Sequence, residues 1–272
     1  MQFRKGRYLL LFLLVMAGGA LSLTTYLWAR GIREMASLDH RYPVIHYKGR
    51  NRPPEVTLEK SRPPHWRSLD HISRLAIGAV LVSEDWAFYA HKGFDIRQIE
   101  NVLEESWKKK RFVRGASTIT QQVARNLLLT KKKTLWRKIR ELTLAILLEK
   151  KWGKKKILET YFNIAEWGEG IYGISLASRT YFGKSPSELT AKEGAFLAML
   201  LPNPKLYSSS FRNQQLTPYA EQTIQRILDK MVQARFLTPE EREMESEILL
   251  PFEVPFEGAV EEELYPEAWL SQ

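Results

Sequence analysis

Residues 134–164, TLWRKIRELTLAILLEKKWGKKKILETYFNI, form a helical pattern that begins with cationic side chains and becomes apolar in its middle. Every residue from Leu144 to Leu148 is apolar, which is typical of a helix packed in a core. Gly153 interrupts the pattern, so we expect helices over 134–150 and 154–164. The segment therefore predicts a buried helical layer with a charged edge.

Lys133, Arg137 and Glu141 are spaced by four residues at this charged edge. On a helix they share one face, and Glu141 lies where the cationic face meets the buried one. Arg137 would then fix the orientation and ionisation of Glu141. The alternative is a plain i, i+4 salt bridge, worth a few tenths of a kcal/mol, and the spacing alone favours it.

Further helices are expected over 72–84, 95–110, 117–130, 171–181, 187–200 and 218–235, where apolar residues recur at spacings of three and four. The alternation of β-branched residues that marks a sheet protein is largely missing. The sequence therefore predicts a mainly α fold.

The stretch from Tyr8 to Ala29 contains no charged residue. As a helix it would be about 33 Å long, enough to cross the ~30 Å hydrocarbon layer of a bilayer. A cleaved signal peptide is the alternative, because small residues follow the apolar middle at 18–20. Apolar residues continue beyond that point, so we predict a retained anchor in residues 1–30. The bases before the span favour a cytoplasmic N-terminus, although Arg30 and Arg33 on the other flank oppose this.

Proline content and charge divide the rest of the chain. Residues 31–71 contain five prolines and predict an extended tether, and residues 72–238 predict the globular domain. Residues 1–239 carry forty basic and twenty acidic side chains, whereas residues 240–272 carry eleven glutamates and one arginine. The basic excess favours phosphate-bearing partners, and residues 239–272 are predicted to be a poorly ordered acidic tail. The absence of cysteine excludes disulfides and thiolate metal sites.

Glu84 and Asp85 end the first predicted helix, within EDWAFYAHKG at 84–93. The helix dipole disfavours negative charge at this end, so the pair needs nearby cations or a use for a raised pKa. A carboxylate partly desolvated beside Trp86 and Phe88 would suit a general base. The alternative, which this feature alone favours, is a surface acid pair.

A second string, GASTITQQVARN at 115–126, places Ser117, Gln121 and Arg125 four residues apart. On one helix this spacing stacks a hydroxyl, an amide and a guanidinium on one face, next to free N–H groups at the helix start. Such a face suits a diphosphate. A capped amphipathic helix with an incidental polar stripe explains the string equally well.

Taken together, five strings resemble the motifs of glycosyltransferase family 51, the peptidoglycan glycosyltransferases that polymerise lipid II. They follow the family's order over about residues 72–235: EDWAFYAHKG at 84–93, GASTITQQ at 115–122, RKIRE at 137–141, Lys154 with ILETYFN at 157–163, and Gly170 through YFGK at 181–184. The resemblance implies a lysozyme-like glycosyltransferase domain with a small membrane-associated subdomain around 95–115. It also implies a single-pass protein of the bacterial inner membrane, with its domain on the exterior side.

By the same resemblance, Glu84 is the general base, and Glu141, oriented by Arg137, assists departure of undecaprenyl diphosphate or holds a cation. The implied substrate-binding residues are Ser117, Gln121, Arg125, Lys133, Arg137, Asp85 and Lys138. The resemblance allows a divalent cation, magnesium or manganese, at the diphosphate and implies no other cofactor, and no local metal motif demands the ion. The implied partners are lipid II, the growing glycan strand, the membrane and other cell-wall synthesis proteins.

Two other functions remain as alternatives. A lytic muramidase-type glycosidase would cut the same polymer with paired carboxylates, but it would need no cationic site for a diphosphate. A membrane-tethered nucleic-acid-binding protein would explain the net charge of +10, but an exterior domain seldom meets nucleic acid, so we expect no such partner. Because no Lys-Thr-Gly string occurs, we expect the monofunctional type, without a transpeptidase domain.

Overall fold

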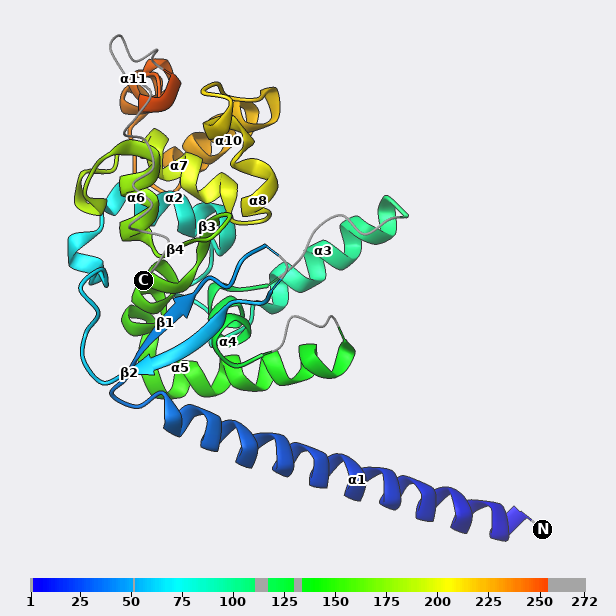
Figure 1. Cartoon of the computed structure of the whole chain (residues 1–272). Helices are drawn as coiled ribbons and strands as arrows, with labels where there is room; N and C mark the ends of the chain where they lie inside the picture. The colour runs from blue at the N-terminus through cyan, green and yellow to red at the C-terminus, as the bar shows by residue number, and fades with distance from the viewer. Residues whose placement is uncertain (1, 51, 111–116, 130–133, 254–272) are drawn as a thin grey trace.

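The computed structural model describes residues 2–50, 52–110, 117–129 and 134–253, and helices dominate it (Figure 1). The described strands form two small antiparallel hairpins, and the other elements are helices. This confirms the predicted mainly α fold. The elements are α1 (Gln2–Ser37), β1 (Tyr42–His46), β2 (Glu55–Glu59), η1 (Leu69–His71), α2 (Arg74–Glu84), α3 (Ile96–Lys108), α4 (Ile119–Leu128), α5 (Leu135–Ile164), β3 (Glu166–Gly168), β4 (Ile171–Tyr172), α6 (Ile174–Phe182), η2 (Pro186–Glu188), α7 (Ala191–Leu200), α8 (Pro204–Tyr207), α9 (Ser209–Arg212), α10 (Pro218–Gln233), α11 (Pro239–Glu247) and η3 (Pro251–Glu253).

Helix α7 lies in the core of the domain, and all ten of its residues are buried. Helices α2 and α10 pack against it. The approach of α2 is close at Gly194, where an added Cβ would lie 2.6 Å from the Cα of Ala76. This contact fixes the position of α2, and α2 carries Glu84 as its last residue.

Helix α5 packs along α4 and bends at Gly153, whose φ of 68° and ψ of 169° are not helical. The bend lies at the glycine where the sequence predicts a break. The second half of α5 holds the segment before α2: Trp66 Nε1 donates a 2.8 Å hydrogen bond to Glu159, and the Asn163 side chain accepts from the Arg67 N–H at 2.7 Å. Much of the ILETYFN string therefore has a structural role.

Residues 31–71 differ from the predicted extended tether. Helix α1 continues to Ser37, and β1 pairs with β2 in a register that runs from Tyr42 opposite Glu59 to His46 opposite Glu55. Trp66 is buried and its ring meets the Tyr42 ring at 5.2 Å. The prolines mainly flank two short strands, so proline content was a poor guide to this segment.

Residues 239–253 differ from the predicted acidic tail. Thr238 and Glu241 form a capping box at the start of α11, where the helix dipole favours negative charge. Leu250 is buried, and the Phe252 ring lies 5.1 Å from the Phe196 ring of α7. The domain therefore continues to residue 253, and residues 254–272 lie outside the described part of the chain.

Helix α1 extends away from the body of the domain, and its segment Phe12–Ser37 is long and apolar enough to cross a bilayer. In Figure 1, α3 and the first turns of α5 extend toward the same side as the free end of α1. Exposed apolar side chains occur on both elements, notably Trp107 and Leu135. They are suited to a membrane-associated subdomain around 95–115, which stays a prediction.

Candidate active site

Glu84 ends α2 because the next residue leaves the helical conformation, with a φ of −156° and a ψ of 74° at Asp85. The Glu84 side chain is half-buried and points to α4, where Gln122 Nε2 donates a 2.7 Å hydrogen bond to its Oε2. Tyr161 of α5 in turn donates from its hydroxyl to Gln122 Oε1 at 3.3 Å. The two bonds fix the Gln122 amide so that its N–H faces the carboxylate.

Burial raises the pKa of Glu84 above its ordinary value of 4.5, because the charged form loses solvation. The Gln122 hydrogen bond and the positive charge of Arg125 offset part of this rise. Burial also raises the pKa of Tyr161 well above its usual range, so its hydroxyl remains a donor. A carboxylate with one amide donor, a nearby cation and a raised pKa is suited to accept a proton.

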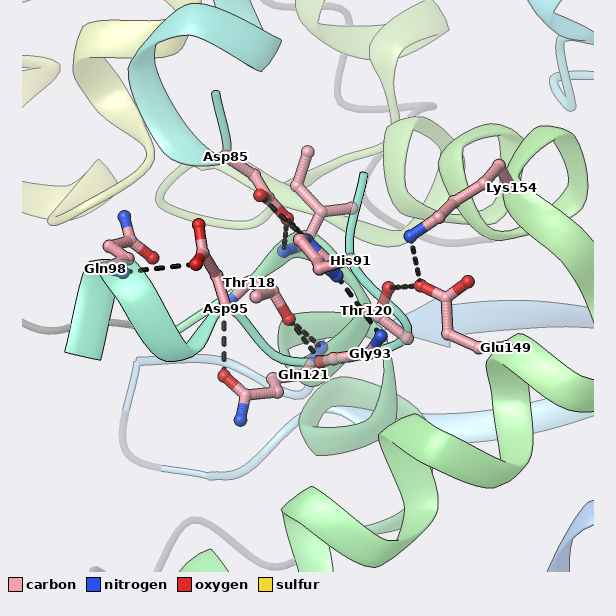
Figure 2. Close-up of polar contacts among 11 residues, drawn as sticks. Asp85, His91, Gly93, Asp95, Gln98, Thr118, Thr120, Gln121, Glu149 and Lys154 are labelled. Carbon is pink, nitrogen blue, oxygen red and sulfur yellow. Dashed lines mark hydrogen bonds and ion pairs between the residues drawn. The ribbon is translucent and has the colours of Figure 1, made fainter. Parts of the chain in front are cut away.

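Asp85 lies beside Glu84 in sequence but has different surroundings (Figure 2). It is buried, and both of its carboxylate oxygens lie 2.9–3.0 Å from His91 Nε2. Its Oδ2 also accepts the backbone N–H of Ile119, the first residue of α4, at 2.9 Å. These contacts join the loop after α2 to the start of α4. The contacts give Asp85 a positioning role, and its substrate-binding role stays a prediction.

Gln121 likewise serves the structure of α4. Its side chain accepts from the Thr118 N–H at 3.0 Å, while Thr118 Oγ1 accepts from the Gln121 N–H at 3.2 Å, which completes a capping box. Thr118 also donates to the carbonyl of Gly93 at 2.7 Å. Because α4 begins at Ile119, Ser117 precedes the helix, and the predicted shared face of Ser117, Gln121 and Arg125 does not form.

The first turns of α5 build a second charged cluster. Glu141 is buried, its Oε2 accepts from Arg137 Nη1 at 2.6 Å, and its Oε1 accepts from Lys138 Nζ at 2.5 Å. Lys138 also donates to Ser117 Oγ at 2.9 Å, which connects this cluster to the segment before α4. The structure thus brings together four of the predicted residues: Ser117, Arg137, Lys138 and Glu141.

The predicted residues therefore fall into two sets. Glu84 interacts with Arg125 of α4, and the Glu141 cluster meets Ser117 just before α4. Lys133 lies outside the described residues. Such an arrangement can provide a proton acceptor and, separately, cations for a leaving anion.

Sequence reasoning missed several residues that hold this site. Gln122 and Tyr161 orient Glu84. Gln122 is the second glutamine of the GASTITQQ string, directly after the predicted Gln121. Thr120 of α4 donates to Glu149 at 2.6 Å, and Lys154 donates to the same Glu149 oxygen at 2.6 Å (Figure 2). Their side chains join α4 to both halves of α5 across the bend.

A divalent cation finds few ligands among these side chains. Both oxygens of Glu141 are paired with cationic groups, and both oxygens of Asp85 face His91 and the α4 backbone. Within the described ranges, no group of three or more histidine, aspartate or glutamate side chains could hold a metal ion. Glu141 thus does not fit the predicted cation-holding role, and an ion held by the diphosphate itself stays a prediction.

Comparisons with known proteins identify the family of this chain. The transglycosylase family model matches residues 54–232. Proteins named biosynthetic peptidoglycan transglycosylase are similar to this chain: the one from Dechloromonas aromatica is 40% identical over 61% of this chain and 71% of its own length. That from Aromatoleum aromaticum is 40% identical over 66% and 75%, and that from Shewanella denitrificans is 47% identical over 59% and 68%. The matched region contains both Glu84 and Glu141 and covers more than half of the chain, and the chain belongs to the transglycosylase family.

Proposed function

We propose that this protein polymerises lipid II into linear glycan strands of peptidoglycan by inverting glycosyl transfer and releases undecaprenyl diphosphate. The names of its relatives point to this substrate class. The observation that carries the proposal is Glu84, a half-buried carboxylate with a raised pKa, held by Gln122 and placed near Arg125.

In the proposed reaction, Glu84 accepts the proton of the acceptor 4-hydroxyl as that oxygen attacks C1 of the donor sugar. The bond between C1 and the diphosphate oxygen breaks, and the electron pair leaves with undecaprenyl diphosphate. Because attack and departure occur on opposite faces of C1, the anomeric centre inverts. Gln122 keeps the Glu84 carboxylate in one orientation during this step.

The leaving diphosphate needs cations, because its negative charge grows as the bond breaks. Arg125, Arg137 and Lys138 supply three, and Lys133 is the fourth candidate. The Ser117 hydroxyl, next to Lys138, adds a further polar contact. Glu141 holds Arg137 and Lys138 in place, so its proposed role is to orient the diphosphate-binding cations.

The lytic alternative fits the side chains less well. Glycoside cleavage needs a second carboxyl group that is free to act near the scissile bond. In the described part of the chain, the other acids among the predicted site residues are Asp85 and Glu141. Both are buried, and their carboxylate oxygens already accept hydrogen bonds. Neither of these two acids is therefore free to act with Glu84 as the second carboxyl group of a glycosidase.

The apolar helix α1 is consistent with a membrane-anchored enzyme. We propose that the N-terminus, with Arg4, Lys5 and Arg7, is cytoplasmic. The domain then lies on the exterior side of the membrane. Helix α3, which carries the exposed Trp107, extends toward the same side as the free end of α1 (Figure 1).

Incubation of the purified chain with labelled lipid II tests the proposal. Gel separation distinguishes polymer, disaccharide fragments and unchanged substrate. We expect polymer from the wild type and far less from Glu84→Gln in the same time. Disaccharide fragments released from preformed glycan would support the lytic alternative, and unchanged lipid II would refute the proposed function.

A further inference from the structure

The last turns of α1 pack against α5. Leu27 and Met35 are buried and lie with Gly31 and Glu34 on one face of the helix, and Leu38, just after the helix ends, is also buried. Neighbouring residues on the other face, such as Ile32, are exposed. The helix that is long and apolar enough to cross a membrane thus continues directly into the packing of the domain.

The two helices approach most closely at Gly31. A Cβ added there would lie 2.5 Å from Leu147 Cδ1 and 3.5 Å from Leu144 Cδ2. A glycine at a helix contact allows this approach, because no side chain separates the two helices. Gly18 and Gly19, in the same helix, have no atom within 4 Å of an added Cβ.

Polar contacts flank this close approach. Glu34 accepts hydrogen bonds from Arg140 Nη2 at 2.6 Å and from Arg30 at 3.0 Å. The side chains of Arg140 and Glu34 are 16% and 23% exposed. Lys151 donates to Asp39 at 2.6 Å, just after the helix ends. The same length of α5 is therefore held on both sides of Leu147.

This length of α5 also carries the charged cluster of the candidate active site. Arg140 and Glu141 are consecutive, and Arg140 faces Glu34 while Glu141 faces Arg137 and Lys138. Beside the α5 residues that meet α1, therefore, lie the cationic groups that the proposed function assigns to the diphosphate. A shift of α5 relative to α1 would move all of them together.

We propose that the juxtamembrane end of α1 positions the first half of α5, residues 135–152, and that Gly31 and Glu34 are positioning residues for the proposed reaction. This inference rests on the proposed function for its catalytic consequence, although the contact itself does not. The anchor then sets the placement of the diphosphate-binding cations, in addition to keeping the enzyme in the membrane.

The test compares Gly31→Leu with Gly19→Leu in the full chain, purified in detergent micelles. Both variants place the same side chain in α1, but only position 31 meets α5. We expect Gly31→Leu to speed amide hydrogen exchange over 135–152, with exchange in α7 unchanged, and to lower kcat by on the order of tenfold, since small displacements of catalytic groups are costly. Gly19→Leu should match the wild type in both.

A second pair of variants tests the same contact by charge. Glu34→Lys should reproduce the faster exchange, and Arg140→Glu added to it should restore slow exchange and part of kcat. Unchanged exchange in Gly31→Leu, equal losses in Gly31→Leu and Gly19→Leu, or equally fast exchange in α7 would overturn the inference. Exchange is measured without substrate, so a wild type that fails to polymerise lipid II would refute the proposed function and leave the packing comparison intact.

Discussion

The two glutamates of the candidate active site have opposite surroundings. Glu84 ends a helix, receives one amide hydrogen bond and has a pKa raised by burial. Glu141 lies within a helix, is fully buried and contacts two cationic side chains. Desolvation raises the proton affinity of Glu84. The Glu141 carboxylate instead serves as the counter-charge of Arg137 and Lys138. In the proposed reaction, this contrast separates a residue that accepts a proton from one that positions other side chains.

The largest expected effect is on catalysis by the first glutamate. Glu84→Gln keeps the shape and the hydrogen bond to Gln122 but removes the base, so we expect lipid II polymerisation to fall by about 10²–10⁴-fold. Initial rates with labelled lipid II measure this. Activity within about tenfold of the wild type would contradict the assignment of Glu84 as the base.

Donor binding should depend on a different residue. Arg125→Ala removes a cation near the reacting end of the substrate, and we expect it to weaken donor affinity more than Glu84→Gln does. A polymerisation-inactive lipid II analogue titrated into each variant in detergent measures the affinity. Equal affinities for the two variants would remove Arg125 from the proposed diphosphate contacts.

The stabilities of two matched variants sharpen the comparison. Glu141→Gln leaves Arg137 and Lys138 without their counter-charge, so we expect a loss of about 1–3 kcal/mol in the free energy of unfolding. Glu84→Gln should not lower stability at pH 7. Because the folded-state pKa of Glu84 is raised, its ionisation costs stability above that pKa and costs nothing below the unfolded-state pKa.

Denaturant unfolding at pH 7 and pH 4 therefore distinguishes the two glutamates. Any stability that Glu84→Gln gains at pH 7 should disappear at pH 4, where the wild-type carboxyl is largely neutral. A loss for Glu84→Gln as large as the loss for Glu141→Gln would show that the two carboxylates do the same structural work.

The smallest effects concern the partners of Glu84. The Gln122 hydrogen bond lowers the pKa of Glu84, so Gln122→Leu should move the acid limb of the pH–rate profile to higher pH. Tyr161→Phe removes only the 3.3 Å bond to Gln122 and should move it less. A limb that moves to lower pH in Gln122→Leu would mean that Gln122 does not stabilise the charged carboxylate.

Local patterns predicted much of the fold and part of the site. The end of α2 at Glu84, the bend at Gly153 and the pairing of Arg137 with Glu141 depend on neighbours within a few residues. The start of α4 was predicted two residues early, which placed Ser117 on one helix face with Gln121 and Arg125. The capping box from Thr118 to Gln121 is the signal that would have corrected this register.

Contacts between distant segments were beyond sequence reasoning. Asp85 bonds to the backbone of Ile119, and Glu34 pairs with Arg140 far along the chain. Neither contact leaves a periodic trace in the sequence, because its two partners are far apart along the chain. The order of residues 239–253 was missed for a similar reason, since Leu250 and Phe252 pack on helices that precede them.

The pH dependence of kcat/KM for lipid II tests most directly whether a desolvated Glu84 is the base. The wild type should show an acid limb with an apparent pKa above the ordinary 4.5 of a glutamate, and the residual activity of Glu84→Gln should lack that limb. The same limb in both proteins, or a wild-type limb below 4.5, would contradict the role given to Glu84.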